Sequence, residues 1–337
     1  MCPLAVDAET RHQAICLLIL LSACRNACLA ALQHSATDPL LKRVSRSFYL
    51  SLRLLPGPMR GAASLAYLLA RASDTLADSA TAPPALRLDC LERFSRYLRD
   101  GQPAPWPDAI LQGIHDPAEK QLLLETPSLL TALGDFPAAE AELIREVVSI
   151  IITGQSLDLV RFGEASSENP VVLPDDATLD DYTWRVAGCV GEFWTRLGLL
   201  TLGTAYSNKP ADVLVAQAVR YGRGLQLVNI LRDLPADLAH GRCYLPLPDP
   251  GETGRLLQEH ARWLETARGH IAAGFTYSAA LPSRRLRTAS VLPALIARET
   301  LDLLAAAGPA VLRGRIKVTR SAVYRSLFRG FLMRNES

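Results

Sequence analysis

The sequence predicts an all-α protein, a single-domain helical bundle around a central apolar cavity. Nearly every long segment carries apolar residues at helical spacing, and no convincing run of alternating apolar and polar residues marks a strand. Hydrophobic residues make up 49% of the 337 residues, which is enough for one large core. Two of the apolar helical segments also carry polar stripes that need a shared interior space. Length alone would equally allow two average domains.

The overall charge and the cysteines exclude several classes of protein. Lys and Arg total 36 and Asp and Glu total 34, so the formal net charge of +2 gives no reason to expect nucleic acid or an anionic membrane as a partner. The 7 cysteines contain no CxxC pair, which predicts neither a disulfide framework nor a structural zinc site. A reducing, cytoplasmic setting fits this cysteine usage best.

The most apolar run, residues 14–24, is too short to span a bilayer. A signal peptide is the rival interpretation, but acidic residues precede the run and an amphipathic pattern continues after it, so we do not expect cleavage. No later run is long and apolar enough for a membrane span. Any membrane contact is therefore expected to be peripheral.

Prolines and glycines divide the chain into the expected helices, because proline removes a backbone donor and restrains the residue before it. Residues 1–35 are expected to form a terminal helix that ends at a break at residues 38–39. Surface loops are expected at residues 100–108 and 163–181, which are rich in proline or in acidic residues. The remaining expected helical segments are residues 40–55, 62–78, 85–99, 109–133, 138–162, 182–204, 210–245 and three helices within 252–331.

Two of these expected helices, residues 138–162 and 182–204, contain residues that indicate a binding site. Gln155 and Asp158, near Gly154, can bring a further polar group to the cavity. Gly188 and Gly191 are spaced for close helix packing or for room beside a substrate, since each glycine costs about 1 kcal/mol relative to alanine in a helix interior.

One polar stripe lies on the helix that precedes Pro246. Gln226, Asn229, Asp233 and Asp237 stand at i, i+3, i+7 and i+11, so they share one face of an otherwise apolar helix. Inward carboxylates are costly unless a cation meets them. A proline between the two aspartates is expected to kink the helix and turn the second carboxylate toward the cavity.

A second stripe of the same kind occurs earlier, formed by Tyr67, Arg71, Asp74 and Asp78 at i, i+4, i+7 and i+11. One D-x-x-x-D pattern is weak evidence, because carboxylates four residues apart usually decorate a wet face. Two stripes on apolar helices are stronger, and we predict that the helices face each other across one cavity. Four carboxylates there would repel one another unless they shared a divalent cation, and oxygen ligands of this kind suit Mg²⁺.

Four stretches resemble successive signatures of the squalene/phytoene synthases, at residues 44–49, 67–78, 182–191 and 225–246. The resemblance runs from about Asp38 to the C-terminus. It implies an isoprenoid-synthase-type helical bundle, with a catalytic domain at residues 38–337 and an N-terminal extension of undefined role at residues 1–37.

The resemblance implies head-to-head condensation of two isoprenyl diphosphates. The family pattern assigns the two aspartate pairs to Mg²⁺ ions that bridge to the diphosphates, and Arg71, Arg232 and Arg242 to diphosphate contacts, for which the guanidinium fork is suited. The positions that match substrate-binding residues of the family are Ser45, Ser47, Phe48, Gln226, Asn229, Arg232, Arg242 and Tyr244.

The catalytic group implied by the resemblance consists of Tyr182, Tyr67 and Arg71. Tyr182 matches the reactive-site tyrosine of the family, and a tyrosine ring can stabilise a carbocation while its hydroxyl assists proton transfer. The alternative for both tyrosines is a buried side chain with a hydrogen-bonded hydroxyl and no part in the chemistry.

The first aspartate motif resembles squalene synthases more than phytoene synthases. Residues 315–318 resemble the segment whose lysine helps to bind NADPH, which makes Lys317 the candidate for that role; its alternative is a surface lysine. Ala236 stands where many relatives carry an acidic residue. The expected reaction joins two farnesyl diphosphates through presqualene diphosphate, with NADPH-dependent reduction to squalene, a sterol or hopanoid precursor.

Two kinds of alternative function remain. A sister enzyme would stop at presqualene diphosphate or make phytoene or dehydrosqualene without reduction. A non-catalytic assembly factor is the alternative from another class, but such proteins are expected to have lost acidic motif residues, and all four aspartates are present here.

Overall fold

The structure is a computed structural model that describes residues 39–45, 48–79, 81–101, 105–314, 316 and 318–332. The expected N-terminal extension, Ser47 and Lys317 lie outside these described residues. Within the described part of the chain, helices dominate and no helix is long and apolar enough to cross a membrane.

The helices of the first half begin where the prolines predicted. Residues 39–44 are helical, and the helices that follow are α2 (Phe48–Leu54), α3 (Gly57–Ala77), α4 (Pro84–Asp100), α5 (Asp108–Gln112), α6 (Pro117–Thr131) and α7 (Ala138–Phe162). Prolines stand at the start of α3, α4, α5 and α7, where their missing N–H leaves no hydrogen bond unmade. Before α6, the Asp116 carboxylate accepts a hydrogen bond from the Ala118 amide at 2.7 Å and caps the helix.

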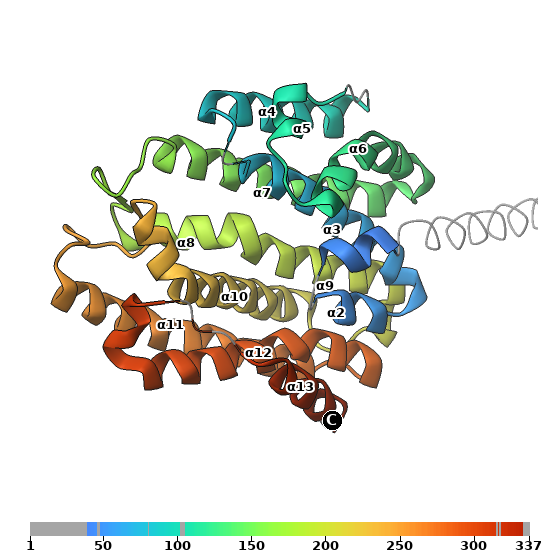
Figure 1. Cartoon of the computed structure of the whole chain (residues 1–337). Helices are drawn as coiled ribbons and strands as arrows, with labels where there is room; N and C mark the ends of the chain where they lie inside the picture. Colours follow the sequence, from blue (N-terminus) through green and yellow to red (C-terminus); the bar gives the residue numbers. More distant parts are fainter. Residues whose placement is uncertain are drawn as a thin grey trace, which may run out of the picture.

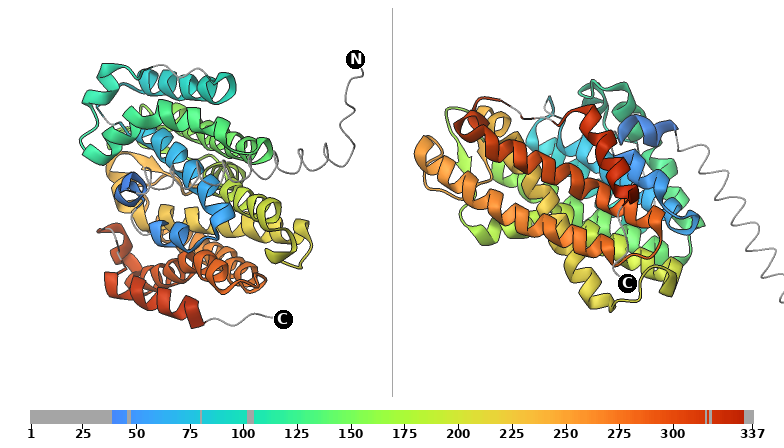
Figure 2. Two further views of the ribbon diagram at one scale, coloured as in Figure 1. Left: turned by 90° about the vertical axis from the view of Figure 1, so that its right-hand side faces the viewer. Right: turned by 90° about the horizontal axis from the view of Figure 1, so that it is seen from below.

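The second half adds the helices that close the bundle: α8 (Asp176–Thr183), α9 (Cys189–Leu202), α10 (Ala211–Ala239), α11 (Thr253–Ala279), α12 (Arg284–Ala307) and α13 (Arg320–Leu332). Figure 1 shows α4, α5 and α6 on one side of the molecule and α11, α12 and α13 on the opposite side, with α3 and α7 to α10 between them. The left view of Figure 2 shows the same order of layers.

Two expectations for residues 163–204 are wrong in part. The expected loop 163–181 contains the start of α8, because the Asp175 carboxylate accepts a hydrogen bond from the Thr178 amide at 2.7 Å and caps that helix. The expected single helix 182–204 is instead the end of α8, a π-helical turn at Trp184–Gly188, and α9. Periodicity does not reveal a π turn, since it adds only one residue to the repeat.

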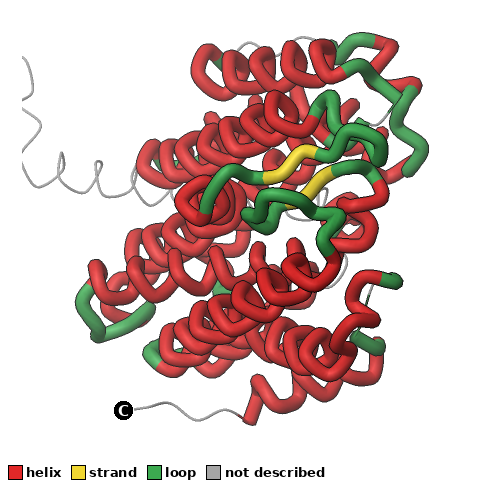
Figure 3. The backbone as a smooth tube through the Cα atoms, turned by 90° about the vertical axis from the view of Figure 1, so that its left-hand side faces the viewer, coloured by secondary structure: helices red, strands yellow, loops and turns green. Residues whose placement is uncertain are grey.

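The described chain also contains one short parallel strand pair, although no strand was expected. β1 (Val171–Val172) pairs with β2 (Arg242–Cys243), and Figure 3 shows the pair against the helices. Strands of two residues are too short to give an alternating pattern. Gly241 precedes β2 at a φ of 72°, where a Cβ would lie 2.0 Å from the Ser166 carbonyl oxygen, so the turn requires glycine. The pair fixes the segment that carries Arg242 and Tyr244.

Two glycines bring the centre of the bundle together. A Cβ on Gly191 of α9 would lie 2.1 Å from the Ala218 carbonyl oxygen of α10. A Cβ on Gly222 of α10 would lie 2.2 Å from the Ala187 carbonyl oxygen. The backbones therefore approach so closely that no residue with a Cβ would fit at these two positions. This confirms the expected packing role of Gly191.

Candidate active site

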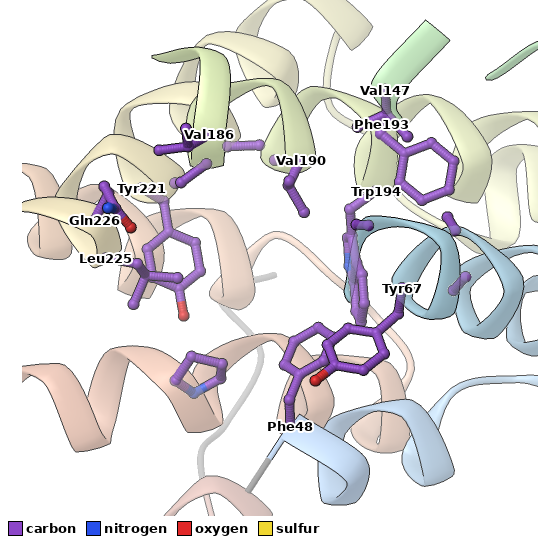
Figure 4. A pocket seen from close by; sticks show the side chains of 18 of the residues that line it. Phe48, Tyr67, Val147, Val186, Val190, Phe193, Trp194, Tyr221, Leu225 and Gln226 are labelled. Carbon is purple, nitrogen blue, oxygen red and sulfur yellow. The ribbon is translucent and has the colours of Figure 1, made fainter. Parts of the chain in front are cut away.

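An apolar cavity of about 400 Å³ occupies the centre of the bundle. Side chains from α2, α3, α7, α9, α10, α11 and α12 line it, and most of them are apolar. Figure 4 shows Phe48, Tyr67 and Trp194 together on one wall. The Phe48 ring stacks on Tyr67 with centroids 5.3 Å apart, and its centroid lies 6.3 Å from that of Trp194. The central apolar cavity predicted from the sequence is thus present.

The two polar stripes contribute to the same cavity. Tyr67 and Asp74 of α3 line it from one side, and Gln226 and Asn229 of α10 line it from another. The Asn229 Nδ2 donates to Gln226 Oε1 at 3.3 Å, so the two amides act as one polar group. The prediction that the two helices face each other across one cavity is confirmed.

Asp74 stands at the end of the cavity wall where polar contacts begin. Its Oδ1 accepts a hydrogen bond from Gln155 of α7, and its Oδ2 lies 3.8 Å from Arg71 Nη1. Burial, followed by the charge of Asp78, raises the pKa of Asp74 to about 7. The side chain nevertheless keeps 45% of its accessible surface, because it faces the open cavity and not packed protein atoms.

Arg71 and Asp78 lie near Asp74, at the C-terminal end of α3. Arg71 forms an ion pair with Glu119 of α6, a residue that the sequence patterns did not indicate, because Glu119 looks like an ordinary acidic residue in a first helical turn. Asp78 follows the last turn of α3. Burial raises its pKa, and the charges of Arg71 and Arg242 offset only part of this shift. Arg87 of α4 donates to the Ala77 carbonyl oxygen at 2.9 Å and holds the same helix end.

The second aspartate pair lies beyond Gln226 and Asn229 on α10. Asp233 accepts two hydrogen bonds from its neighbour Arg232, at 3.0 and 2.6 Å. Burial raises the pKa of Asp237 to about 6, while Arg242 opposes and Asp233 adds to that shift. Helix α10 continues through Pro235 to Ala239, so both aspartates remain on one helix.

Tyrosines stand between the carboxylates of three helices. The Tyr244 hydroxyl donates to Asp158 Oδ2 of α7 at 3.0 Å. Tyr182 stacks on the Tyr244 ring with centroids 5.1 Å apart and planes at 24°. Burial raises the pKa of Tyr182, and the charges of Asp158, Asp74 and Asp237 add to this shift. The Tyr182 hydroxyl is therefore within electrostatic reach of carboxylates from α3, α7 and α10.

The π-helical turn at Trp184–Gly188 begins two residues after Tyr182. Two of its residues, Val186 and Ala187, line the cavity. Such turns are frequent at functional sites because they alter which side chains face inward. Here the turn separates the tyrosine at the polar end from the apolar wall made by α9.

The segment at residues 44–49 reaches the cavity through Phe48 alone among its described residues. Ser45 is buried, with its hydroxyl bonded to the Leu41 carbonyl oxygen. The Val44 carbonyl oxygen accepts a hydrogen bond from the Tyr67 hydroxyl at 3.2 Å. The sequence assigned Ser45 to substrate contact, and its hydroxyl here serves the backbone of its own segment.

The donor set suits a hard cation that is shared with a ligand. The carboxylates of Asp74, Asp78 and Asp237 have raised pKa values, chiefly because burial disfavours their charged form, and a bound cation would offset this cost. In the described part of the chain, no three carboxylate, imidazole or thiol side chains form a ready cage for one ion. The Asp74 carboxylate faces the cavity, and one or two carboxylates together with water and substrate phosphate commonly hold Mg²⁺.

The comparison with protein families matches residues 41–322 to the squalene/phytoene synthases. The chain belongs to the squalene/phytoene synthase family. This family consists of head-to-head prenyl-diphosphate synthases, which are prenyltransferases. The family predicted from the four sequence stretches is confirmed.

Curated relatives of the chain carry two kinds of name. The chain is 29% identical over 300 residues to the presqualene diphosphate synthase of Sinorhizobium fredii, an alignment that covers 85% of this chain and 93% of the relative. It is 29% identical over 239 residues to the bifunctional lycopene cyclase/phytoene synthase of Pyrenophora tritici-repentis, which covers 68% of this chain and 38% of that protein. The chain spans between 34% and 56% of the length of three curated relatives.

Among solved structures, the fold is similar to that of TcSQS in complex with a ligand. The TM-score is 0.71 at 22% sequence identity, and the superposition covers 91% of this chain and 86% of the other. The predicted fold class, an isoprenoid-synthase-type helical bundle, is confirmed by this likeness.

Proposed function

We propose that this member of the family joins two molecules of farnesyl diphosphate head to head through presqualene diphosphate and reduces the product to squalene with NADPH. The observation that carries the proposal is that the two polar stripes reach one apolar cavity, through Tyr67 and Asp74 of α3 and through Gln226 and Asn229 of α10. Such a cavity suits prenyl chains. At one end of it Asp74 lies near Asp78, and Asp158 and Asp237 lie nearby; this acidic end suits metal-bound diphosphates.

The charged residues have complementary tasks in this reaction. Asp74, Asp78, Asp233 and Asp237 would hold Mg²⁺, which when bound supplies positive charge for the departing diphosphate. The arginines that would bind diphosphate oxygens are Arg71, Arg232 and Arg242, and Arg71 and Arg232 are already oriented by Glu119 and Asp233. Pre-oriented guanidinium groups bind phosphate at little cost in reorganisation.

The apolar wall protects the cationic stage of the reaction. Ionisation of an allylic diphosphate leaves a carbocation that water would quench, so the chain must exclude water around it. The aromatic faces of Phe48, Tyr67 and Trp194 line the cavity and can stabilise a passing positive charge. Lys317 remains the candidate for NADPH binding.

The test is incubation of the purified full-length protein with farnesyl diphosphate and Mg²⁺, with and without NADPH. We expect presqualene diphosphate without NADPH and squalene with it. Asp74→Ala combined with Asp233→Ala should lower turnover by at least about 10³-fold, because the acidic end then holds neither metal nor diphosphate. Asp212→Ala, an exposed carboxylate on the same helix as Asp233, is the matched control and should leave turnover unchanged. Full activity in the double variant would refute the metal assignment.

A second candidate is a presqualene diphosphate synthase without the reductive step. A relative with this name aligns with 85% of the chain at 29% identity. The same incubation separates the two candidates, since a product unaffected by NADPH would contradict squalene synthesis and support the second.

A further inference from the structure

Asp158 of α7 belongs to neither aspartate stripe, yet it stands at the same acidic end. Its Oδ2 accepts the hydrogen bond of the Tyr244 hydroxyl at 3.0 Å. Its Oδ1 is buried and has no hydrogen-bond partner among the described residues. A buried carboxylate oxygen that receives no hydrogen bond is costly, which suggests a function for it.

The hydrogen bond from Tyr244 fixes the ring on which Tyr182 rests. Tyr244 lies between two aromatic rings, with its centroid 4.9 Å from that of Phe162 and 5.1 Å from that of Tyr182. Aromatic pairs at these separations have preferred orientations. Loss of the anchoring carboxylate would therefore release Tyr244 and, through it, Tyr182.

Burial raises the pKa of Asp158 to about 6, so the group can exchange a proton near neutral pH. The hydrogen bond from Tyr244 and the charge of Arg242 oppose this shift, and the charge of Asp78 adds to it. The titratable and charged groups that act on Asp158 or are affected by it are Asp78 of α3, Arg161 of α7, Tyr182 of α8, Asp237 of α10, and Arg242 and Tyr244 at β2.

A head-to-head coupling must release one proton. The C–O bond of one diphosphate breaks and its electron pair leaves with the diphosphate. The π electrons of the second molecule form the new C–C bond and leave a cation on that molecule. A C–H bond then breaks, its electron pair neutralises the cation, and the proton needs an acceptor. The four stripe aspartates cannot take this task if they hold metal ions.

We propose that Asp158 positions Tyr244 and Tyr182 and takes up this proton, with the Tyr244 hydroxyl as the relay. The inference rests on the proposed function. As the tyrosine oxygen receives a proton, its own proton moves along the existing hydrogen bond to Asp158 Oδ2. The carboxylate becomes a neutral acid, and the tyrosine returns to its neutral form. Asp158 then loses the proton to water before the next turnover.

Asp158→Asn separates positioning from proton uptake. The asparagine oxygen still accepts the Tyr244 hydrogen bond, but the amide cannot take up a proton. We expect the variant to melt near the wild-type temperature and to keep its KM for farnesyl diphosphate, while kcat falls by about 10²-fold. Asp158→Ala removes both functions and should also raise KM. Glu142→Gln, an exposed carboxylate on the same helix, is the matched control and should behave as wild type.

The pH profile gives the second readout. A proton acceptor must be ionised, so wild-type kcat should fall on the acid side of neutrality, and Asp158→Asn should remove one titrating group from this limb, to which Asp74 and Asp237 also contribute. Carboxyl ¹³C NMR requires no turnover and should show a resonance that titrates near pH 6 and is missing from the variant.

Three results would overturn the inference or its basis. An active wild type together with an Asp158→Asn variant of unchanged kcat and pH profile would refute proton uptake by Asp158. Titration of the Asp158 resonance near pH 4 would do the same. A wild-type protein that forms no coupled product would instead contradict the proposed function itself.

Discussion

Asp74 is a residue whose charge would help to bind a ligand but lowers the stability of the ligand-free protein. Its carboxylate is surrounded by protein on the side of Gln155 and opens to the cavity on the other. Burial and the neighbouring charge of Asp78 disfavour its ionised form, and Arg71 offsets only part of this effect. The unliganded protein thus holds an acid whose ionisation costs stability.

The first prediction concerns Asp74→Asn. The folded-state pKa of Asp74, about 7, lies above its ordinary value of 3.8, so ionisation destabilises the folded protein increasingly as the pH rises through this window. Asparagine keeps an oxygen for the Gln155 hydrogen bond and removes the charge. We expect the variant to melt above wild type at pH 8, with a smaller gap at pH 5, in thermal unfolding followed by circular dichroism without metal. A gap that widens toward pH 5 would contradict the raised pKa.

At the scale of elements, the contact between α9 and α10 determines the shape of the cavity. Gly191 lets α9 approach α10, Gly222 lets the π-helical turn before α9 approach α10, and both residues also line the cavity. The same positions therefore serve packing and substrate space together. The sequence left these two uses of glycine as alternatives, and the structure unites them.

The second prediction tests this contact with Gly191→Ala. The new methyl group would lie 2.1 Å from the Ala218 carbonyl oxygen, so the helices must separate, and we expect a loss of about 1–3 kcal/mol in the free energy of unfolding. Gly269→Ala is the matched control, because a methyl group on that helical glycine of α11 would have no atom within 4 Å. The control should gain about 0.4–1 kcal/mol. Urea unfolding of both variants measures the difference, and equal stabilities would argue against a close helix contact.

The elements that the sequence predicted well are the ones with a long, repeated signal. Helical periodicity and proline breaks located α3, α4, α7 and α10, although α10 ends at Ala239 and β2 occupies part of the expected helix at residues 210–245. The two polar stripes then predicted which helix faces meet, because charged groups on apolar helices need a common space. The meeting of α3 and α10 at one cavity could therefore be predicted before any contact was known.

The parts that the sequence missed depend on single contacts between distant segments. Glu119 pairs with Arg71 across α3 and α6, and no spacing in the sequence relates the two residues. The β1–β2 pair has two residues in each strand and joins segments about seventy positions apart, which no local pattern encodes. The sequence indicates Asp158 only as a polar residue that can reach the cavity, because its hydrogen bond with Tyr244 exists only in the folded chain.

At the scale of the whole molecule, carboxylates from three helices, α3, α7 and α10, come together at the acidic end. Carboxylates of α3, α7 and α10 raise one another's pKa, as the effects of Asp78 on Asp158 and of Asp158 on Asp237 show. Mutual repulsion of this kind favours separation of the helices in the free protein. A ligand of opposite charge that binds all three would reverse the effect.

The last prediction follows from this balance and concerns Mg²⁺ and inorganic diphosphate added together. Diphosphate alone meets an acidic wall, and Mg²⁺ alone finds no ready cage among the described residues, so each should raise the melting temperature little. Together they neutralise each other's charge and can bind the stripes of α3 and α10 at once. Stabilisation by a ligand grows as RT ln(1 + [L]/Kd), about 2.7 kcal/mol at 100 times the Kd. We expect a rise in melting temperature by calorimetry only with both present, and none in the Asp74→Ala, Asp233→Ala variant. A full rise with Mg²⁺ alone would point to a preformed metal site and against a shared one.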